Sequence, residues 1–170
     1  MKVTLYMTTT VNGIIAKYDD SADFITPAES TNYVVAVKAA GAVIVGRRTY
    51  EILSTQPEFQ EFLKAGVKMV AVSQGDFKVQ DANHSVARSP QEALEIVKDF
   101  DEVIVAGGGK IDAAFLDANL IDEIYLDIEP NIVSEGIALF SEGKSDRALK
   151  FLDSKMFSEN EIQLHYQVLK

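Results

Sequence analysis

The sequence contains no cysteine, so disulfide bonds, thiolate nucleophiles and cysteine-ligated metals are excluded. Histidine is nearly as scarce. The two histidines are His84, in a predicted loop, and His165, on the last predicted strand. They are too few and too far apart in the sequence to indicate a metal site, so no metal is predicted. We expect His165 to lie on the exposed side of its strand.

Long apolar runs are also missing. No stretch approaches the roughly 18 to 20 apolar residues of a membrane-spanning helix. Residues 1–6 lack the apolar core and cleavage site of a signal peptide and have the character of a strand instead. Together with the absence of cysteine, these features predict a cytoplasmic protein with no membrane partner.

Positive charge is scarce. The chain has 16 lysines and arginines against 26 aspartates and glutamates, and its formal net charge is −10. Nucleic-acid binding depends on a basic face that releases counterions, so this balance argues against a nucleic-acid partner. An anionic ligand would have to find its cations locally. The candidates are Arg47, Arg48 and Lys110, each just after a predicted strand.

The length of 170 residues suits one domain with a sizeable core, and the apolar fraction of 47% is ordinary for a globular protein. No internal repeat, low-complexity tract or linker divides the chain. We therefore expect a single domain over residues 1–170.

Strand and helix patterns alternate along most of the chain. Two helix starts are marked by a capping residue followed by proline and glutamate, at Thr26-Pro27-Ala28-Glu29 and Ser89-Pro90-Gln91-Glu92. Strands are predicted at residues 2–10, 14–16, 42–45, 67–72, 85–87, 103–106, 123–128, 149–152, 155–157 and 162–169, and helices at 27–40, 90–98 and 111–116, with shorter helical segments after residue 46 and around 59–63. This order predicts a three-layer α/β/α fold around a mixed, mostly parallel sheet with a C-terminal antiparallel hairpin at one edge.

The most informative stretch is residues 102–110. A buried strand stops at Gly107, Gly108 and Gly109, and a helix follows at once. A tight turn with φ > 0 would need only one glycine. Three remove every Cβ from the place where phosphates could meet the N-terminus of the helix. The stretch is not the GxGxxG fingerprint, because Ile111 and Asp112 stand where its last glycine belongs.

Two other predicted strands end in polar turns, Gly46-Arg47-Arg48-Thr49 and Ser73-Gln74. Ligands of open α/β sheets bind beyond the carboxyl ends of the parallel strands, where all three turns would lie. The arginine pair on its own could equally be a solvated surface pair. Together, the turns offer backbone N–H groups, hydroxyls and cations, which suits a ligand with several phosphates.

Residues 45–51, 72–74 and 103–110 resemble the dihydrofolate reductase fold. That superfamily includes the reductase domain of the bifunctional deaminase-reductase of riboflavin biosynthesis. Residues 10–16 are similar to the Ser-x-Asp-Gly-x-Ile-Ala opening of this second branch, and residues 120–140 resemble its closing motif. The ordered motifs cover nearly the whole domain, so the resemblance is to a stand-alone reductase domain of the riboflavin branch.

The resemblance implies an NADPH-dependent oxidoreductase that acts on a C=N or C=O bond of a pteridine-like or aminopyrimidine-like heterocycle. Arginine suits the 2′-phosphate of NADPH because its guanidinium is a forked, charged donor. The residues implied for the adenosine phosphate and pyrophosphate are Gly46, Arg47, Arg48, Thr49 and Ser73; those for the pyrophosphate and nicotinamide ribose are Gly107, Gly108, Gly109, Lys110 and Ile111; and those along the nicotinamide and substrate are Thr10, Gly13, Ile14 and Ala16. Relatives in the riboflavin branch pair through their sheet edges, which implies a homodimer.

Two carboxylates are candidates for catalysis. In folate-reducing relatives an acidic residue at the start of the first helix pairs with the pterin ring, and Glu29 stands in the corresponding place. The alternative is that Glu29 only completes a capping box with Thr26. Asp127, on the strand at 123–128, could point toward the site or could be a solvated residue at a sheet edge.

Two departures from the riboflavin-branch pattern argue against the phosphoribosyl-aminouracil as substrate. Asn12 replaces the usual aspartate, and Ser134-Glu135-Gly136 replaces a more glycine-rich segment with an acidic one. Two other classes of function stay open at this point. One is a non-catalytic domain that binds NADP or another small molecule, and the other is a structural dimerisation module.

Overall fold

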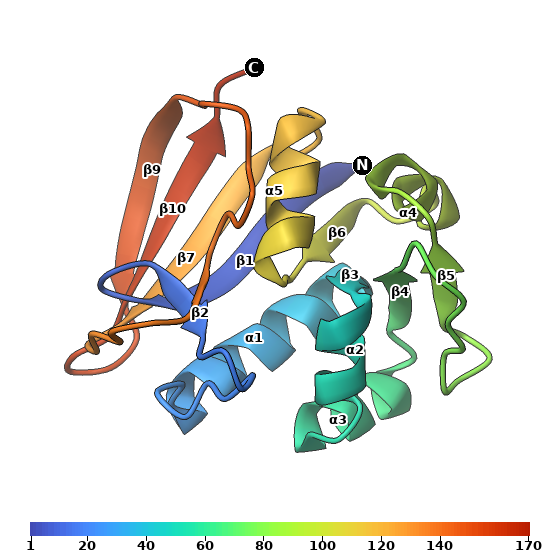
Figure 1. Ribbon diagram of the computed structural model, residues 1–170, viewed down its shortest axis with the longest axis horizontal. Coiled ribbons are helices and arrows are strands. Elements are labelled where there is room, and N and C mark those ends of the chain that lie inside the picture. The colour runs from blue at the N-terminus through green and yellow to red at the C-terminus, as the bar shows by residue number, and fades with distance from the viewer.

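The computed structural model describes residues 1–170, which form a large mixed sheet flanked by helices and a small second sheet (Figure 1). The strands are β1 Lys2–Thr10, β2 Ile14–Ala16, β3 Ala42–Gly46, β4 Lys68–Val72, β5 Ser85–Ala87, β6 Glu102–Val105, β7 Glu123–Glu129, β8 Ile137–Ala138, β9 Leu149–Met156 and β10 Ile162–Val168. The helices are α1 Pro27–Ala40, α2 Arg47–Leu53, α3 Pro57–Ala65, α4 Pro90–Ile96 and α5 Gly109–Asp117. None of these helices is long and apolar enough to cross a membrane.

The main sheet has eight strands in the order β5-β4-β3-β6-β1-β7-β10-β9. Neighbouring strands from β5 to β7 are parallel, and β10 and β9 form an antiparallel hairpin beside β7. The predicted parallel centre and antiparallel edge are therefore confirmed. The short strand β8, which the sequence pattern did not indicate, pairs with β2 in a separate two-stranded sheet.

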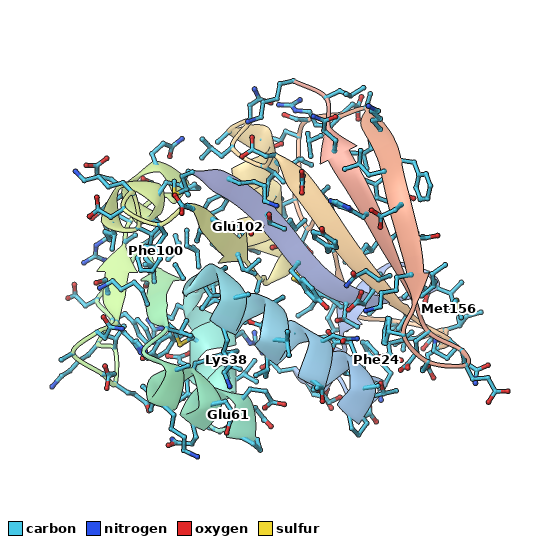
Figure 2. The ribbon with its side chains drawn as sticks, turned by 180° about the vertical axis from the view of Figure 1, so that it is seen from behind. Phe24, Lys38, Glu61, Phe100, Glu102 and Met156 are labelled. Carbon is cyan, nitrogen blue, oxygen red and sulfur yellow. The ribbon has the colours of Figure 1, made fainter.

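The sheet is covered on both faces, which explains why its central strands are apolar without alternation. On β3, Ile44 packs in one buried cluster with Phe115 of α5, whereas Val43 and Val45 pack in a second cluster with Phe62 of α3. Figure 1 shows α5 in front of the sheet, and Figure 2, from behind, shows α1 in front of the opposite face. The predicted three-layer fold is confirmed.

Helix α1 begins and ends where local sequence signals place it. The hydroxyl of Thr26 accepts a hydrogen bond from the backbone N–H of Glu29, and Pro27 occupies the first turn. Gly41 ends the helix with a φ of 76°, which glycine adopts without strain. Helix α4 ends at Ile96 rather than at residue 98, because the N–H of Val97 bonds to the carbonyl of Leu94 and closes a tighter turn.

The C-terminal hairpin corrects two predictions. The segments predicted at 149–152 and 155–157 are one continuous strand, β9, which accommodates its polar middle because it is a solvent-exposed edge that pairs with β10 along its length. The side chain of His165 is only 12% exposed rather than on an open face. Its ring stacks on Tyr125 at 4.0 Å, and its Nε2 lies 3.0 Å from a carboxylate oxygen of Glu123. Both groups belong to β7, which pairs with β10. Because β10 lies between β7 and β9, side chains of the neighbouring strands cover His165.

Candidate active site

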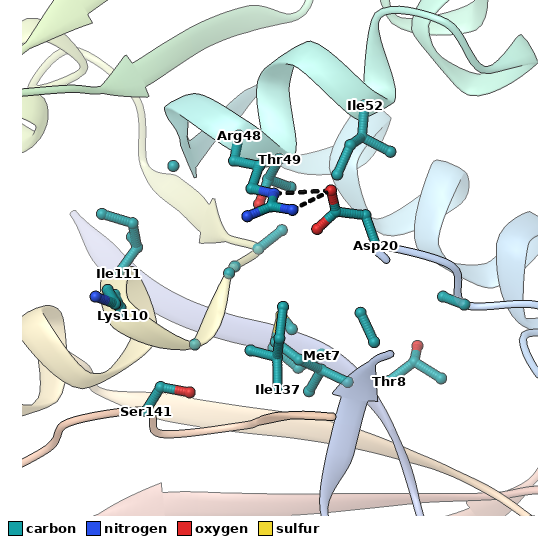
Figure 3. A pocket seen from close by; sticks show the side chains of 18 of the residues that line it. Met7, Thr8, Asp20, Arg48, Thr49, Ile52, Lys110, Ile111, Ile137 and Ser141 are labelled. Carbon is teal, nitrogen blue, oxygen red and sulfur yellow. Dashed lines mark hydrogen bonds and ion pairs between the residues drawn. The ribbon is translucent and has the colours of Figure 1, made fainter. Parts of the chain in front are cut away.

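A single large cleft, with a volume of about 880 Å³, opens at the carboxyl-end edge of the parallel strands (Figure 3). Its walls come from β1, the loop at residues 18–25, the first turns of α1, the turns after β3 and β6, and the segment around β8. Parallel strands present their carboxyl ends together, so residues distant in the sequence meet here.

The glycine turn after β6 lies in this cleft, as do Lys110 and Ile111. The turn is tied to its neighbour by a hydrogen bond of 2.7 Å from the N–H of Gly46 to the carbonyl of Gly107. Gly108 is the N-cap of α5 and provides no side-chain cap, so the first backbone N–H groups of this helix have no capping partner. An anion in the cleft could accept hydrogen bonds from them.

Packing gives a second reason for glycine in this turn. A Cβ on Gly109 would lie 2.2 Å from the carbonyl oxygen of Ala138 in β8, which is far below any contact distance. Gly107 has a φ of 83°, in the left-handed region that favours glycine. From the sequence, one glycine was enough for a turn with φ > 0, and ligand approach was favoured as the reason for three. The structure shows that the fold also requires two of them.

The turn after β3 contributes Gly46, Arg47, Arg48 and Thr49 to the cleft. Gly46 is the N-cap of α2 and, like the N-cap of α5, provides no capping side chain. A Cβ on Gly46 would lie 2.9 Å from the side chain of Ile111, so the two turns pack closely. The structure therefore brings together nine of the residues predicted to hold a cofactor, namely Gly46, Arg47, Arg48, Thr49, Gly107, Gly108, Gly109, Lys110 and Ile111.

Each cation of the cleft is paired with a carboxylate. Nη2 of Arg48 lies 2.6 Å from Oδ2 of Asp20, and dashed lines mark this pair in Figure 3. Nζ of Lys110 lies 2.7 Å from Oε1 of Glu142. Within α2, Arg47 pairs with Glu51 at 3.0 Å. Asp20 and Glu142 were not predicted as site residues, because isolated acidic residues in loops give no sequence signal.

Ser73 does not line the cleft, although it follows a strand that ends there. It is buried, and its hydroxyl donates a hydrogen bond to the carbonyl of Gly75. The guanidinium of Arg88 donates to the carbonyls of Ser73 and Gln74. The hydroxyl of Ser73 is thus occupied by a contact within its own turn. The contact of Arg88 with this turn was not predicted from the sequence.

Three of the predicted nicotinamide-side residues also lie outside the lining, while Ala16 lies in it. The hydroxyl of Thr10 donates to Oδ1 of Asn12 at 2.9 Å and accepts from the N–H of Ile14 at 3.0 Å. Gly13 takes a φ of 80° at the turn between β1 and β2. In this structure Thr10, Gly13 and Ile14 shape the turn that carries Ala16 into the cleft.

Glu29 lies in the cleft, and its carboxylate is not part of a capping box. A capping box would return the side chain of Glu29 to the backbone N–H of Thr26. That N–H instead donates to Oε1 of Glu129 at 3.2 Å. The residue is 4% exposed, and Oε1 of Glu29 accepts a hydrogen bond from the hydroxyl of Thr8. No protein group donates to its other oxygen, so that oxygen is available to a ligand.

Burial raises the pKa of Glu29 to about 7. The hydroxyl of Thr8 opposes this shift, because it donates to the carboxylate, and the nearby carboxylates of Asp127, Glu129 and Glu161 add to it by like-charge repulsion. A carboxyl with such a pKa can hold or release a proton near neutral pH.

Asp127 is fully buried and does not line the cleft. Its carboxylate accepts hydrogen bonds from the hydroxyl of Tyr6 at 2.7 Å and from Nε2 of Gln163 at 2.8 Å. The alternative of a solvated edge residue is therefore wrong, because β7 is covered by β10 on that side. Burial raises the pKa of Asp127, and Tyr6 stands between it and the cleft.

Three further buried carboxylates were not predicted. The hydroxyl of Thr26 donates to Glu161, and burial raises the pKa of Glu129 to about 7, with repulsion from Glu161 adding to the shift. Asp112, in the first turn of α5, has no well-formed hydrogen bond on either oxygen. Burial holds its pKa well above its usual range, although the nearby backbone N–H of Gly107 opposes the shift. Of these three residues, only Asp112 gave a sequence signal of its burial, because it is an acidic residue inside an otherwise apolar segment.

Comparison with known proteins places this architecture. A family model described as the RibD C-terminal domain matches residues 1–162. The uncharacterized protein YwjB of Bacillus subtilis (strain 168) is 29% identical in an alignment of 171 positions that covers 97% of each chain.

Solved structures share the fold. A Shewanella sp. PV-4 protein whose name refers to riboflavin biosynthesis superposes with a TM-score of 0.81 at 19% identity, over 100% of both chains. A pyrimidine reductase-like protein of Corynebacterium diphtheriae gives 0.76 at 14% identity, over 99% of this chain and 92% of that one. A diaminohydroxyphosphoribosylaminopyrimidine deaminase/5-amino-6-(5-phosphoribosylamino)uracil reductase of Thermotoga maritima gives 0.74 at 18% identity; this chain is covered over 99% of its length but spans only 56% of that protein.

Proposed function

Because the chain belongs to the RibD C-terminal domain family, we propose that it is an NADPH-dependent reductase that transfers hydride to a C=N or C=O bond of a pteridine-like or aminopyrimidine-like heterocycle. One observation carries the proposal. A single cleft contains two groups of residues. The turns after β3 and β6 provide three cations and two helix starts that lack capping side chains, and α1 provides the carboxylate of Glu29 beside apolar and aromatic side chains of β1 and α1. The first set suits a phosphorylated cofactor, and the second suits a planar ring with N–H groups.

The residues present fit NADPH. The uncapped N–H groups at the start of α5 point to a pyrophosphate, since an anion is what stabilises such a helix end. The guanidinium groups of Arg47 and Arg48 are forked donors of the kind that a 2′-phosphate requires, and both line the cleft. Their carboxylate partners, Glu51 and Asp20, are exposed or half-buried, so the ion pairs contribute little and exchange for phosphate at small cost.

When bound, NADPH supplies the hydride. The chain's own residues orient the substrate and manage its proton. Glu29, ionised, can accept hydrogen bonds from ring N–H groups; protonated, it can donate a proton to a ring nitrogen, and a pKa of about 7 makes both forms accessible. Thr8 fixes the orientation of the carboxylate through its hydroxyl. Apolar neighbours such as Met7 and Ile137 limit water in the cleft.

The first test is cofactor binding. Titration with NADPH should enhance and shift nicotinamide fluorescence. Arg47→Ala and Arg48→Ala should each weaken NADPH binding by roughly tenfold or more, because a charge-assisted hydrogen bond contributes about 1.5–3 kcal/mol. Both variants should change NADH binding far less. Lys98→Ala is a matched control, since Lys98 pairs with Glu95 on the surface away from the cleft. Equal and weak binding of NADPH and NADH by the wild type would refute the proposal.

The second test is turnover. NADPH oxidation is followed with dihydrofolate and with 5-amino-6-(5-phosphoribosylamino)uracil, in the wild type and in Glu29→Gln. Substrate-dependent oxidation that falls by roughly 10²-fold in the variant supports the assigned role of Glu29. Tight NADPH binding without oxidation of any heterocycle would indicate a non-catalytic binding domain instead.

The free edge of the sheet supports pairing of two copies of the chain, which we propose as the assembly. Strand β9 has exposed residues along its whole length, among them Leu149, Phe151 and Met156. An exposed edge strand with unpaired backbone groups can pair with its own copy about a two-fold axis. Sedimentation should then give a dimer, and Phe151→Lys should shift it toward monomer. A monomeric wild type at micromolar concentration would exclude this assembly.

A further inference from the structure

The charges that line the cleft are unevenly distributed. Its cations are Arg47, Arg48 and Lys110, and all of them lie on the turns after β3 and β6. The rest of the lining contains no lysine or arginine. In Figure 3, Lys110 lies at one side of the cleft and Thr8, the partner of Glu29, at the other, with the Arg48–Asp20 pair between them.

The end of the cleft at Glu29 is backed by a cluster of buried carboxyl groups. Asp127, Glu129 and Glu161 are all at least 95% buried. They are connected to the start of α1 by hydrogen bonds, since Thr26 donates its backbone N–H to Glu129 and its hydroxyl to Glu161. Burial raises the pKa of Asp127 and Glu129, so this cluster is partly protonated near neutral pH. The negative charge that it keeps is weakly screened, because the groups are shielded from water.

The side chains around Glu29 are apolar or aromatic. Ile25, Tyr33 and Leu53 line the cleft, and Tyr33 lies one helical turn after Glu29 on α1. A planar ring with N–H donors matches this surface: its faces contact apolar groups and its edge donates to the free oxygen of Glu29. No lysine or arginine is present there to pair with a phosphate dianion.

We infer that the substrate is a non-phosphorylated heterocycle, neutral or protonated, with N–H donors on one edge. This inference rests on the proposed function. The cations that remain in the cleft are paired with carboxylates, and under that function the cofactor phosphates replace those carboxylates. A phosphate on the substrate would therefore face Glu29 and the buried acids without a counter-charge, and like charges in a poorly hydrated site repel strongly.

The decisive measurement uses a matched pair of ligands, 5-amino-6-ribosylaminouracil and its 5′-phosphate. Their dissociation constants are compared by calorimetry in protein saturated with NADP⁺, so that no turnover occurs, and again without cofactor. We expect the riboside to bind at least about tenfold tighter than the phosphate, which corresponds to 1.4 kcal/mol. Tighter or equal binding of the phosphate overturns the inference, and so does failure of both ligands to bind.

Two variants test the physical cause. Glu29→Gln should weaken the riboside and reduce the difference between the two ligands, because a like charge is removed. Gln56→Lys should tighten the phosphate selectively, since Gln56 lines the cleft, is exposed and does not cap α3 with its side chain. An unchanged preference in both variants would exclude the electrostatic explanation. Absence of NADPH binding to the wild type would refute the proposed function. Tighter or equal binding of the phosphate in protein saturated with NADP⁺ would refute the inference alone, because the cofactor then occupies the cations of the cleft.

Discussion

The carboxylate of Asp20 holds the guanidinium of Arg48 across the cleft, with contacts of 2.6 Å to Nη2 and 2.7 Å to Nε. Asp20 belongs to the loop between β2 and α1, whereas Arg48 opens α2. The pair therefore joins the wall proposed to bind cofactor phosphate to the loop that lines the substrate side. An anionic ligand on Arg48 competes directly with Asp20, and this competition can be measured.

Asp20→Asn should tighten NADPH binding by about two- to fivefold, because it removes a carboxylate that competes for Arg48 in an exposed ion pair contributing about 0.2–1 kcal/mol. Fluorescence titration at low and high salt measures the change, which should shrink as salt screens the pair. Asp23→Asn is the control: it removes the same charge from the same loop, but its partner is Lys17, outside the cleft. Weaker NADPH binding in Asp20→Asn would contradict the competition.

Glu29 should make the fold less stable as pH rises. Its pKa is raised from 4.5 to about 7, so between these values the folded state binds more protons than the unfolded state and the free energy of unfolding falls. The full effect is on the order of 3 kcal/mol. Urea unfolding at pH 5 and pH 8 should show a smaller decline in Glu29→Gln than in the wild type. Glu159→Gln, at an exposed position, should keep the wild-type decline. An equal decline in unfolding free energy from pH 5 to pH 8 in all three proteins would refute the raised pKa of Glu29.

Asp112→Asn should stabilise the protein at pH 8 by about 1–3 kcal/mol, because each unit by which folding raises the pKa of this carboxyl costs about 1.4 kcal/mol at such a pH and asparagine does not ionise. The pKa of Asp112 is raised by burial, so its contribution to stability falls as pH rises above the ordinary value of 3.8. Near pH 4 the wild-type side chain is protonated in the fold, and the variant should then gain little. Asp99→Asn, on the surface, serves as control. A gain of the same size at both pH values would point to a cause other than ionisation.

Gly109→Ala should damage the cleft, whereas Gly75→Ala should not. A Cβ at residue 109 would lie 2.2 Å from the carbonyl oxygen of Ala138 and 2.8 Å from Oγ of Ser141, so the segment around β8 would have to move. At residue 75 there is no atom within 4 Å of the added Cβ. We expect a loss of about 1–3 kcal/mol in unfolding free energy, with weaker NADPH binding, only for Gly109→Ala. Thermal unfolding and fluorescence titration measure both.

The sequence by itself determined the elements whose signals are local. Helix α1 has the predicted bounds, because its cap at Thr26, its first-turn proline and its terminal Gly41 act within a few residues. The buried strands were predicted for a similar reason, since a strand covered on both faces must be apolar throughout. Their order implied that the turns after β3 and β6 share one edge, and they do.

Only the tertiary structure decided what the polar side chains do. Glu29 and Thr26 match a capping box, yet Glu129, 103 positions away, takes the backbone N–H of Thr26 and leaves the carboxylate of Glu29 in the cleft. Asp20 reaches Arg48 across 28 positions. A hydrogen bond between neighbouring residues has a fixed spacing that a sequence displays, whereas a bond between distant residues depends on packing. Most of the charged contacts in this cleft join residues that are distant in the sequence.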